Sequence, residues 1–133
     1  MIHGVVNANL EATIPLHVVS PNGLRQEITA IIDTGYNGAL SLPHTTVIAL
    51  ALVPSVPRMV TLGDASQRVL DFYTANIHWG GQVRRIRILC VEGSPLVGTV
   101  LLQGYKLEVD FTPGGAVALT PLSSYPPSSS PYI

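Results

Sequence analysis

The sequence predicts an all-β fold, with the pattern of a small barrel or a sandwich. Eleven prolines and twelve glycines interrupt the 133 residues, so the apolar runs between them are short, as strands usually are. Several runs alternate apolar and polar residues, which is typical of a strand with one buried face. Asn22-Gly23, a strong hairpin signal, joins two of them. Nearly half of the residues are hydrophobic, so one domain with a sizeable core is expected.

The first third of the chain is predicted to form a hairpin, a short strand and a short helix. The predicted strands are 13–19, 26–32 and 39–42, and the predicted helix is 44–52. The second strand leads directly into Asp33. Pro43 suits the first position of a helix, since its missing N–H has no partner there in any case.

The rest of the chain is predicted to form three more strand pairs. In the first pair, strands 59–62 and 69–75 flank a turn at 63–67. In the second, strands 77–79 and 83–91 flank Gly80-Gly81. In the third, strands 107–111 and 116–119 flank a turn at 112–115. Before the last pair lies the compact apolar run Leu96-Val97-Gly98. We expect Thr99 to cap a short helix that runs through Gly104.

Composition sets the expected domain limits, partners and location. Residues 1–122 are predicted to form one domain, and 123–133 are rich in Ser and Pro and are expected to be disordered. Only 11% of residues are charged, so the surface is either small or covered by a partner, and an oligomer is expected. The net charge of −1 argues against nucleic acid and anionic membranes as partners. Without a signal peptide or a long apolar run, a cytoplasmic protein is expected.

The segment Ala30–Gly38, with the sequence AIIDTGYNG, combines features that call for an explanation. An apolar run leads directly into Asp33, and Thr34-Gly35 follow. Placing a carboxylate beside such a run is costly unless something compensates for it. Asp-Thr-Gly alone is a weak motif, but here it follows a hairpin and precedes a strand, a helix and a second hairpin.

This order resembles the retropepsin-like aspartic proteases, the retroviral-type acid proteases and their cellular relatives, over roughly residues 13–119. Asp33-Thr34-Gly35 followed by Tyr36 and Asn-Gly is similar to a prokaryotic subgroup in which an aromatic residue follows the motif. The resemblance implies a small closed β-barrel with one or two short helices. It also implies an aspartic endopeptidase that acts as a homodimer on a peptide or protein substrate, without a cofactor and without a metal.

The resemblance also implies a role for each motif residue. Asp33 is the catalytic aspartate. Thr34 locks the two active-site loops of the dimer together through its hydroxyl, and Gly35 lets the backbone approach its two-fold mate. Val97 and Gly98 support the loop from behind. The residues expected to form the flap or contact substrate are Leu62, Gly63, Asp64, Ala65, Ser66 and Tyr36.

Elementary electrostatics agrees with a paired aspartate. Two carboxyl groups on a two-fold axis cannot both ionise easily, so they share one proton and titrate as a unit. The ionised member takes a proton from water while the protonated member polarises the scissile carbonyl. The compensation for Asp33 is then a second copy of itself.

Other readings of these residues stay open. Asp33-Thr34-Gly35 and Gly63–Ser66 are also ordinary turn sequences. The same barrel could serve as a non-catalytic peptide-binding or dimerisation module; Tyr36 and Val100 favour this, because many relatives carry a small and a polar residue there. A nucleic-acid contact is a third reading, through the basic patch Arg84, Arg85 and Arg87.

Overall fold

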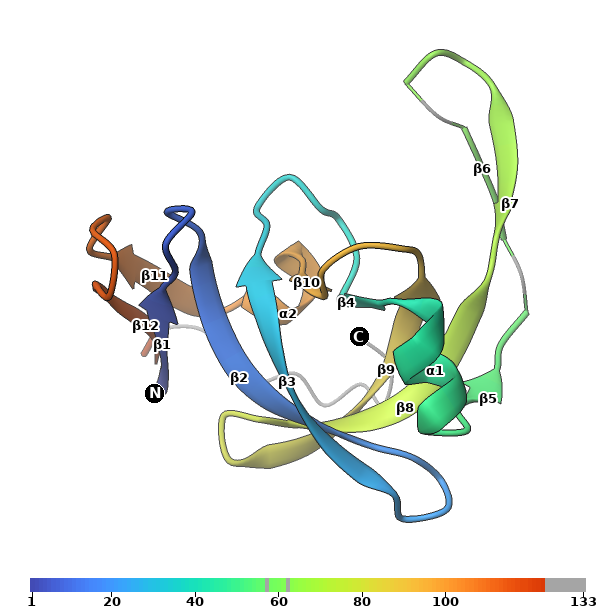
Figure 1. Ribbon diagram of the computed structural model, residues 1–133, viewed down its shortest axis with the longest axis horizontal. Helices are drawn as coiled ribbons and strands as arrows, with labels where there is room; N and C mark the ends of the chain where they lie inside the picture. Colours follow the sequence, from blue (N-terminus) through green and yellow to red (C-terminus); the bar gives the residue numbers. More distant parts are fainter. Residues whose placement is uncertain (57, 62, 124–133) are drawn as a thin grey trace.

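The computed structural model describes residues 1–56, 58–61 and 63–123. Leu62 and all but the first residue of the predicted tail lie outside these ranges. Within them, one sheet has the strand order β11-β12-β1-β2-β3-β10-β4-β9-β8-β5 (Figure 1). Because β2 also pairs with β8, the six strands from β2 to β8 in this order close into a barrel. The predicted closed β-barrel with short helices is confirmed.

The elements have the following bounds. The strands are β1 (Ile2–Val6), β2 (Ala12–Val19), β3 (Arg25–Ile32), β4 (Leu40–Leu42), β5 (Val53–Pro54), β6 (Arg58–Thr61), β7 (Gln67–Leu70), β8 (Phe72–Trp79), β9 (Gln82–Cys90), β10 (Leu96–Val97), β11 (Tyr105–Val109) and β12 (Ala116–Pro121). The helices are α1 (His44–Ala49) and α2 (Thr99–Leu102). No helix in the described part of the chain combines the length and the apolar character that crossing a bilayer would require.

The core fills the barrel with residues from alternate positions of its strands. Ile14 and Val18 on β2 are fully buried, and Ile14 lies opposite the buried Ala30 of β3. Ile86 and Ile88 on β9, another strand of the barrel, are also fully buried. The alternation seen in the sequence therefore sets which face of each strand packs inward.

Both helices are shorter than predicted, for local reasons. Helix α1 ends at Ala49 rather than at residue 52, because Ala51 adopts a left-handed backbone conformation with φ of 49°. Helix α2 ends at Leu102, before Gly104, and the prediction of Thr99 as its cap is wrong, since Gly98 holds the cap position. The extended backbone of Gly98 continues β10, so Thr99 is already helical.

Two features of the sheet were not predicted. The expected strand over 69–75 is broken at Asp71, so that β7 pairs with β6 in a separate sheet and β8 joins the barrel. Strand β1 pairs with both β12 and β2. A Cβ at Gly4 of β1 would collide with the Thr13 carbonyl oxygen, so the close approach of β2 requires glycine there.

Candidate active-site loop

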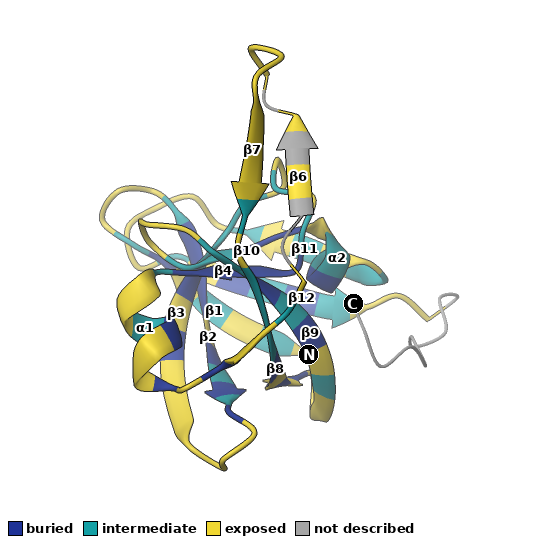
Figure 2. Cartoon of the chain, turned by 90° about the vertical axis from the view of Figure 1, so that its right-hand side faces the viewer, coloured by how far each residue is buried: buried dark blue, intermediate teal, exposed yellow. Residues whose placement is uncertain are grey.

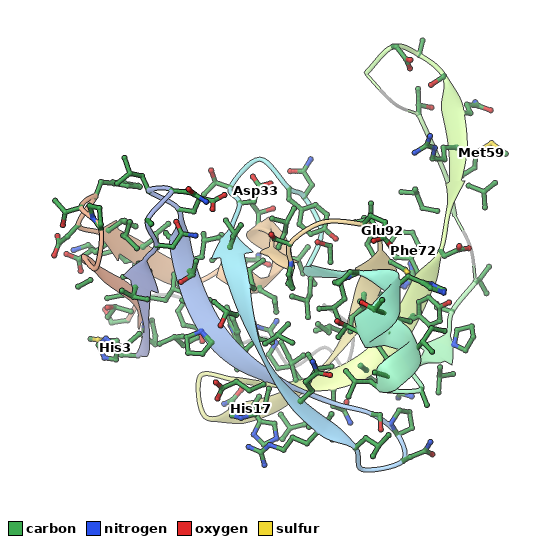
Figure 3. The ribbon with its side chains drawn as sticks, viewed as in Figure 1. His3, His17, Asp33, Met59, Phe72 and Glu92 are labelled. Carbon is green, nitrogen blue, oxygen red and sulfur yellow. The ribbon has the colours of Figure 1, made fainter. Side chains whose placement is uncertain are left out.

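Strand β3 delivers Asp33 to the end of the barrel, and the backbone of β10 fixes it there. β10 runs parallel to β3, with Val97 opposite Ile32. The Asp33 N–H donates to the Val97 carbonyl at 2.9 Å, and the Ile31 N–H donates to the Pro95 carbonyl at 2.9 Å. Figure 3 shows Asp33 beyond the arrowhead of β3, at the end of the barrel opposite His17.

The Asp33 side chain turns back onto its own loop. Its Oδ1 accepts a hydrogen bond of 2.9 Å from the Gly35 N–H, as Asp commonly does at turns. Asp33 is half-buried, whereas Thr34 and Gly35 are exposed. A fixed carboxylate therefore sits beside two residues that a second molecule can reach.

The segment after β10 holds the loop from behind through three further backbone bonds. Gly98 donates to the Ala39 carbonyl at 2.9 Å, Thr99 to the Tyr36 carbonyl at 2.9 Å and Val100 to the Gly38 carbonyl at 3.1 Å. Val97 is fully buried. The structure thus brings Val97 and Gly98 against the Asp33 loop, as expected from the sequence, while their importance for activity stays a prediction.

Tyr36 packs inward, against two glycines. A Cβ on Gly38 would come within 2.5 Å of the Tyr36 Cζ, and a Cβ on Gly98 within 2.6 Å of its Cδ2. Burial of the phenol raises the pKa of Tyr36 to about 12. The ring fills the space that the two glycines leave, so its first role is in packing the loop; a contact with substrate stays a prediction.

The raised pKa of Tyr36 makes stability depend on alkaline pH. The unfolded chain releases this proton near pH 10.0, whereas the folded chain holds it to about 12. We expect the free energy of unfolding to be unaffected by this group below pH 10 and to fall as the pH rises toward 12. Urea denaturation across this range should show a smaller fall for Tyr36→Phe; an identical slope in the variant would contradict this account.

Strands β6 and β7 form a hairpin that stands away from the barrel, on the same end as the Asp33 loop (Figures 1 and 2). At its tip, Asp64 Oδ1 accepts hydrogen bonds from the Ser66 N–H at 2.9 Å and the Ser66 hydroxyl at 2.5 Å. The Ser66 bonds lower the pKa of Asp64. Ala65 has a φ of 67°, and Gly63 to Ser66 are all exposed. The tip has its own local structure, and its role as a flap stays a prediction.

The remaining candidate groups do not assemble into a second site. Strand alternation puts Arg84 on the inner face with Ile86, so Arg84 does not form one patch with Arg85 and Arg87. Burial lowers the pKa of Arg84 and raises the pKa of the Cys90 thiol. Among the described residues, no three His, Cys, Asp or Glu side chains are grouped to hold a metal ion.

Two residues of the loop framework were not selected from the sequence. Ser41 is buried in β4, and its hydroxyl accepts a hydrogen bond of 3.2 Å from the Leu96 N–H, which joins β4 to β10. Gly38 accommodates the Tyr36 ring. Ser41 is the one hydroxyl residue in the apolar run 39–42, and this could have marked it as a buried hydrogen-bonding group. The sequence around Gly38 gave no sign that this glycine makes room for the Tyr36 ring.

Comparison with known proteins places this geometry in a known fold. No protein-family model matches the sequence, and no curated protein matches it. Among solved structures, the chain is similar to a retropepsin-like aspartic protease from Rickettsia conorii, with a TM-score of 0.58 and 18% identity. The match covers 89% of this chain and 87% of that one. The chain therefore has the fold of a retropepsin-like aspartic protease.

Proposed function

We propose that this chain is an aspartic endopeptidase that works as a homodimer, with Asp33 from each copy forming the catalytic pair. The observation that supports this most is the Asp33 loop. It combines a carboxylate fixed by β10 with exposed neighbours, Thr34 and Gly35, at which a second copy can approach. The fold shared with a retropepsin-like aspartic protease adds support.

In the proposed reaction the two Asp33 side chains share one proton. The ionised carboxylate removes a proton from water, and the resulting hydroxide attacks the peptide carbonyl, which the protonated carboxyl group polarises by a hydrogen bond. The peptide lies extended between the barrel and the β6–β7 hairpin, where backbone groups can pair with it as an added strand. The hairpin carries exposed apolar side chains at Met59 and Val69, opposite each other in register, which suit contact with such a peptide.

The proposal is tested by two measurements on the same preparation. Sedimentation over a wide concentration range, at mildly acidic and neutral pH, gives the solution mass, and a peptide library then reports cleavage. Dimer formation together with cleavage supports the proposal. A dimer that binds peptides without cutting them would instead favour the non-catalytic module, and a monomer at every concentration would leave Asp33 without its partner.

Thr34 offers a separate prediction about the dimer. If its hydroxyl bonds to the partner loop, Thr34→Ala removes this bond from both copies, and the dimer dissociation constant should rise roughly tenfold. Thr34→Ser keeps the hydroxyl and is the matched control, for which little change is expected. Equal dissociation constants for the wild type and Thr34→Ala, measured by sedimentation, would remove Thr34 from the interface.

A further inference from the structure

A row of three polar side chains crosses the outside of the barrel, at the end opposite Asp33. Glu27 on β3 lies opposite His17 on β2, and His17 lies opposite His78 on β8. His17 stands between two buried residues of β2, so its side chain points away from the core. Figure 3 shows His17 at the far end of the barrel from Asp33. This row therefore lies outside the candidate active-site loop.

His17 contacts both of its neighbours in the row. Its Nε2 lies 3.3 Å from Glu27 Oε2, and its ring meets the His78 ring edge to face, with 6.1 Å between the centroids. Glu27 and His78 are exposed, and the side chain of His17 is 36% exposed. An ion in solution can therefore reach both imidazole rings.

The row also crosses the seam at which the barrel closes. Strands β2 and β8 pair over three positions, whereas β2 and β3 pair over seven. His17 and His78 are distant in sequence, so a link between their side chains closes a long loop of the chain. A metal ion that makes such a link stabilises the folded state by restricting the unfolded chain. The two imidazoles thus stand where a bound ion would hold the barrel shut.

We propose that His17 and His78 bind one zinc ion between them, that water completes its coordination, and that Glu27 is a positioning residue for His17. With the Nε2 proton held by Glu27, His17 offers Nδ1 to the ion, and the carboxylate makes the imidazole a stronger ligand. Zinc–nitrogen bonds of about 2.0–2.1 Å put two coordinated rings about 5–6 Å apart between centroids. A small rotation of the exposed His78 side chain closes the difference from 6.1 Å.

The donor set selects an ion that prefers nitrogen ligands. The described residues hold no group of three His, Cys, Asp or Glu side chains that suits a metal ion, so a magnesium or calcium ion has no cage of oxygens here. The next row across the same strands begins with Arg25 and ends with Arg85, so charge alone repels cations at this face. Binding depends instead on bonds to imidazole nitrogen, which suits zinc.

Zinc titration by calorimetry and urea denaturation of the full chain test this site. The wild type should bind zinc, and free zinc at 100 times its Kd should lower the unfolding equilibrium constant by up to about 100-fold. His17→Asn and His78→Asn should each raise the zinc Kd at least about tenfold and remove most of this stabilisation. Glu27→Ala keeps both ligands and should raise the Kd about tenfold. Magnesium at the same concentration should have no effect.

His44→Asn is the matched control. It makes the same substitution at an exposed histidine whose Nδ1 lies 3.8 Å from the Cys90 thiol, and it should keep the response to zinc. Denaturation without zinc checks that each variant folds. No zinc binding by the wild type, equal stabilisation by magnesium, or a zinc response that survives in both His17→Asn and His78→Asn would overturn the proposal. An unchanged Kd in Glu27→Ala would overturn the role given to Glu27. None of these results depends on peptide cleavage.

Discussion

Asp33→Asn is expected to lower the rate of peptide cleavage by at least about 10³-fold. The asparagine oxygen can still accept the Gly35 N–H, so the loop keeps its turn, but the amide neither ionises nor takes a proton from water. Because the variant replaces both members of the proposed pair at once, no acid remains at the axis. The free energy of unfolding should stay within about 0.5 kcal/mol of the wild type.

The measurement is cleavage of a peptide identified with the wild type, alongside urea denaturation of each protein. Asp71→Asn is the matched control, since it makes the same substitution at an exposed aspartate between β7 and β8. It should retain wild-type cleavage. Full activity in Asp33→Asn would rule out Asp33 as the catalytic group, and equal losses in both variants would indicate a general effect of removing acidic charge.

Gly98→Ala is expected to destabilise the fold by about 2–3 kcal/mol, a large effect for a single methyl group. The new Cβ would lie 2.6 Å from the Tyr36 carbonyl oxygen and would also collide with the Gly38 carbonyl oxygen. Both are backbone atoms of the loop that carries Asp33, so the clash can be relieved only by moving that loop. Any peptidase activity should fall along with stability.

Urea denaturation again gives the measurement, and the chain offers a matched control. Gly63→Ala adds the same methyl group at the tip of the β6–β7 hairpin, where no described residue other than its chain neighbours has an atom within 4 Å of the added carbon. Its free energy of unfolding should change by less than about 0.5 kcal/mol. Similar small effects at both positions would mean that the loop yields easily and is not held rigidly by the segment behind it.

Local signals in the sequence were sufficient for much of the barrel. Asn22-Gly23 and the alternation on either side of it predicted the β2–β3 hairpin, because turn chemistry and side-chain period are properties of neighbouring residues. The position of Asp33 at the end of β3 followed from the same segment. The Val97-Gly98 run could be placed behind Asp33 only through the resemblance to a known family, since nothing local links residues so far apart.

The errors arose where distant residues decide the local structure. Strand β1 was not predicted, because its place in the sheet depends on β12 and on the close approach of Thr13 to Gly4. Thr99 was predicted as the cap of α2 because threonine is a common capping residue. The cap is Gly98 instead, and its backbone hydrogen bond to the loop after Asp33 cannot be read from the sequence. The inward direction of the Tyr36 side chain was also not predicted, because the space that the ring fills is left by two glycines, Gly38 and Gly98, on different segments.

The insertion of β10 between β3 and β4 has a consequence for how the molecule folds. The Asp33 loop is complete only after a segment from the last third of the chain has paired on both sides, so its contacts have high sequence separation. Closing such long loops slows folding. A chain emerging from the ribosome would therefore carry the Asp-Thr-Gly motif without a shaped loop until residues 96–97 had also emerged, and the loop would form late in the folding of the barrel.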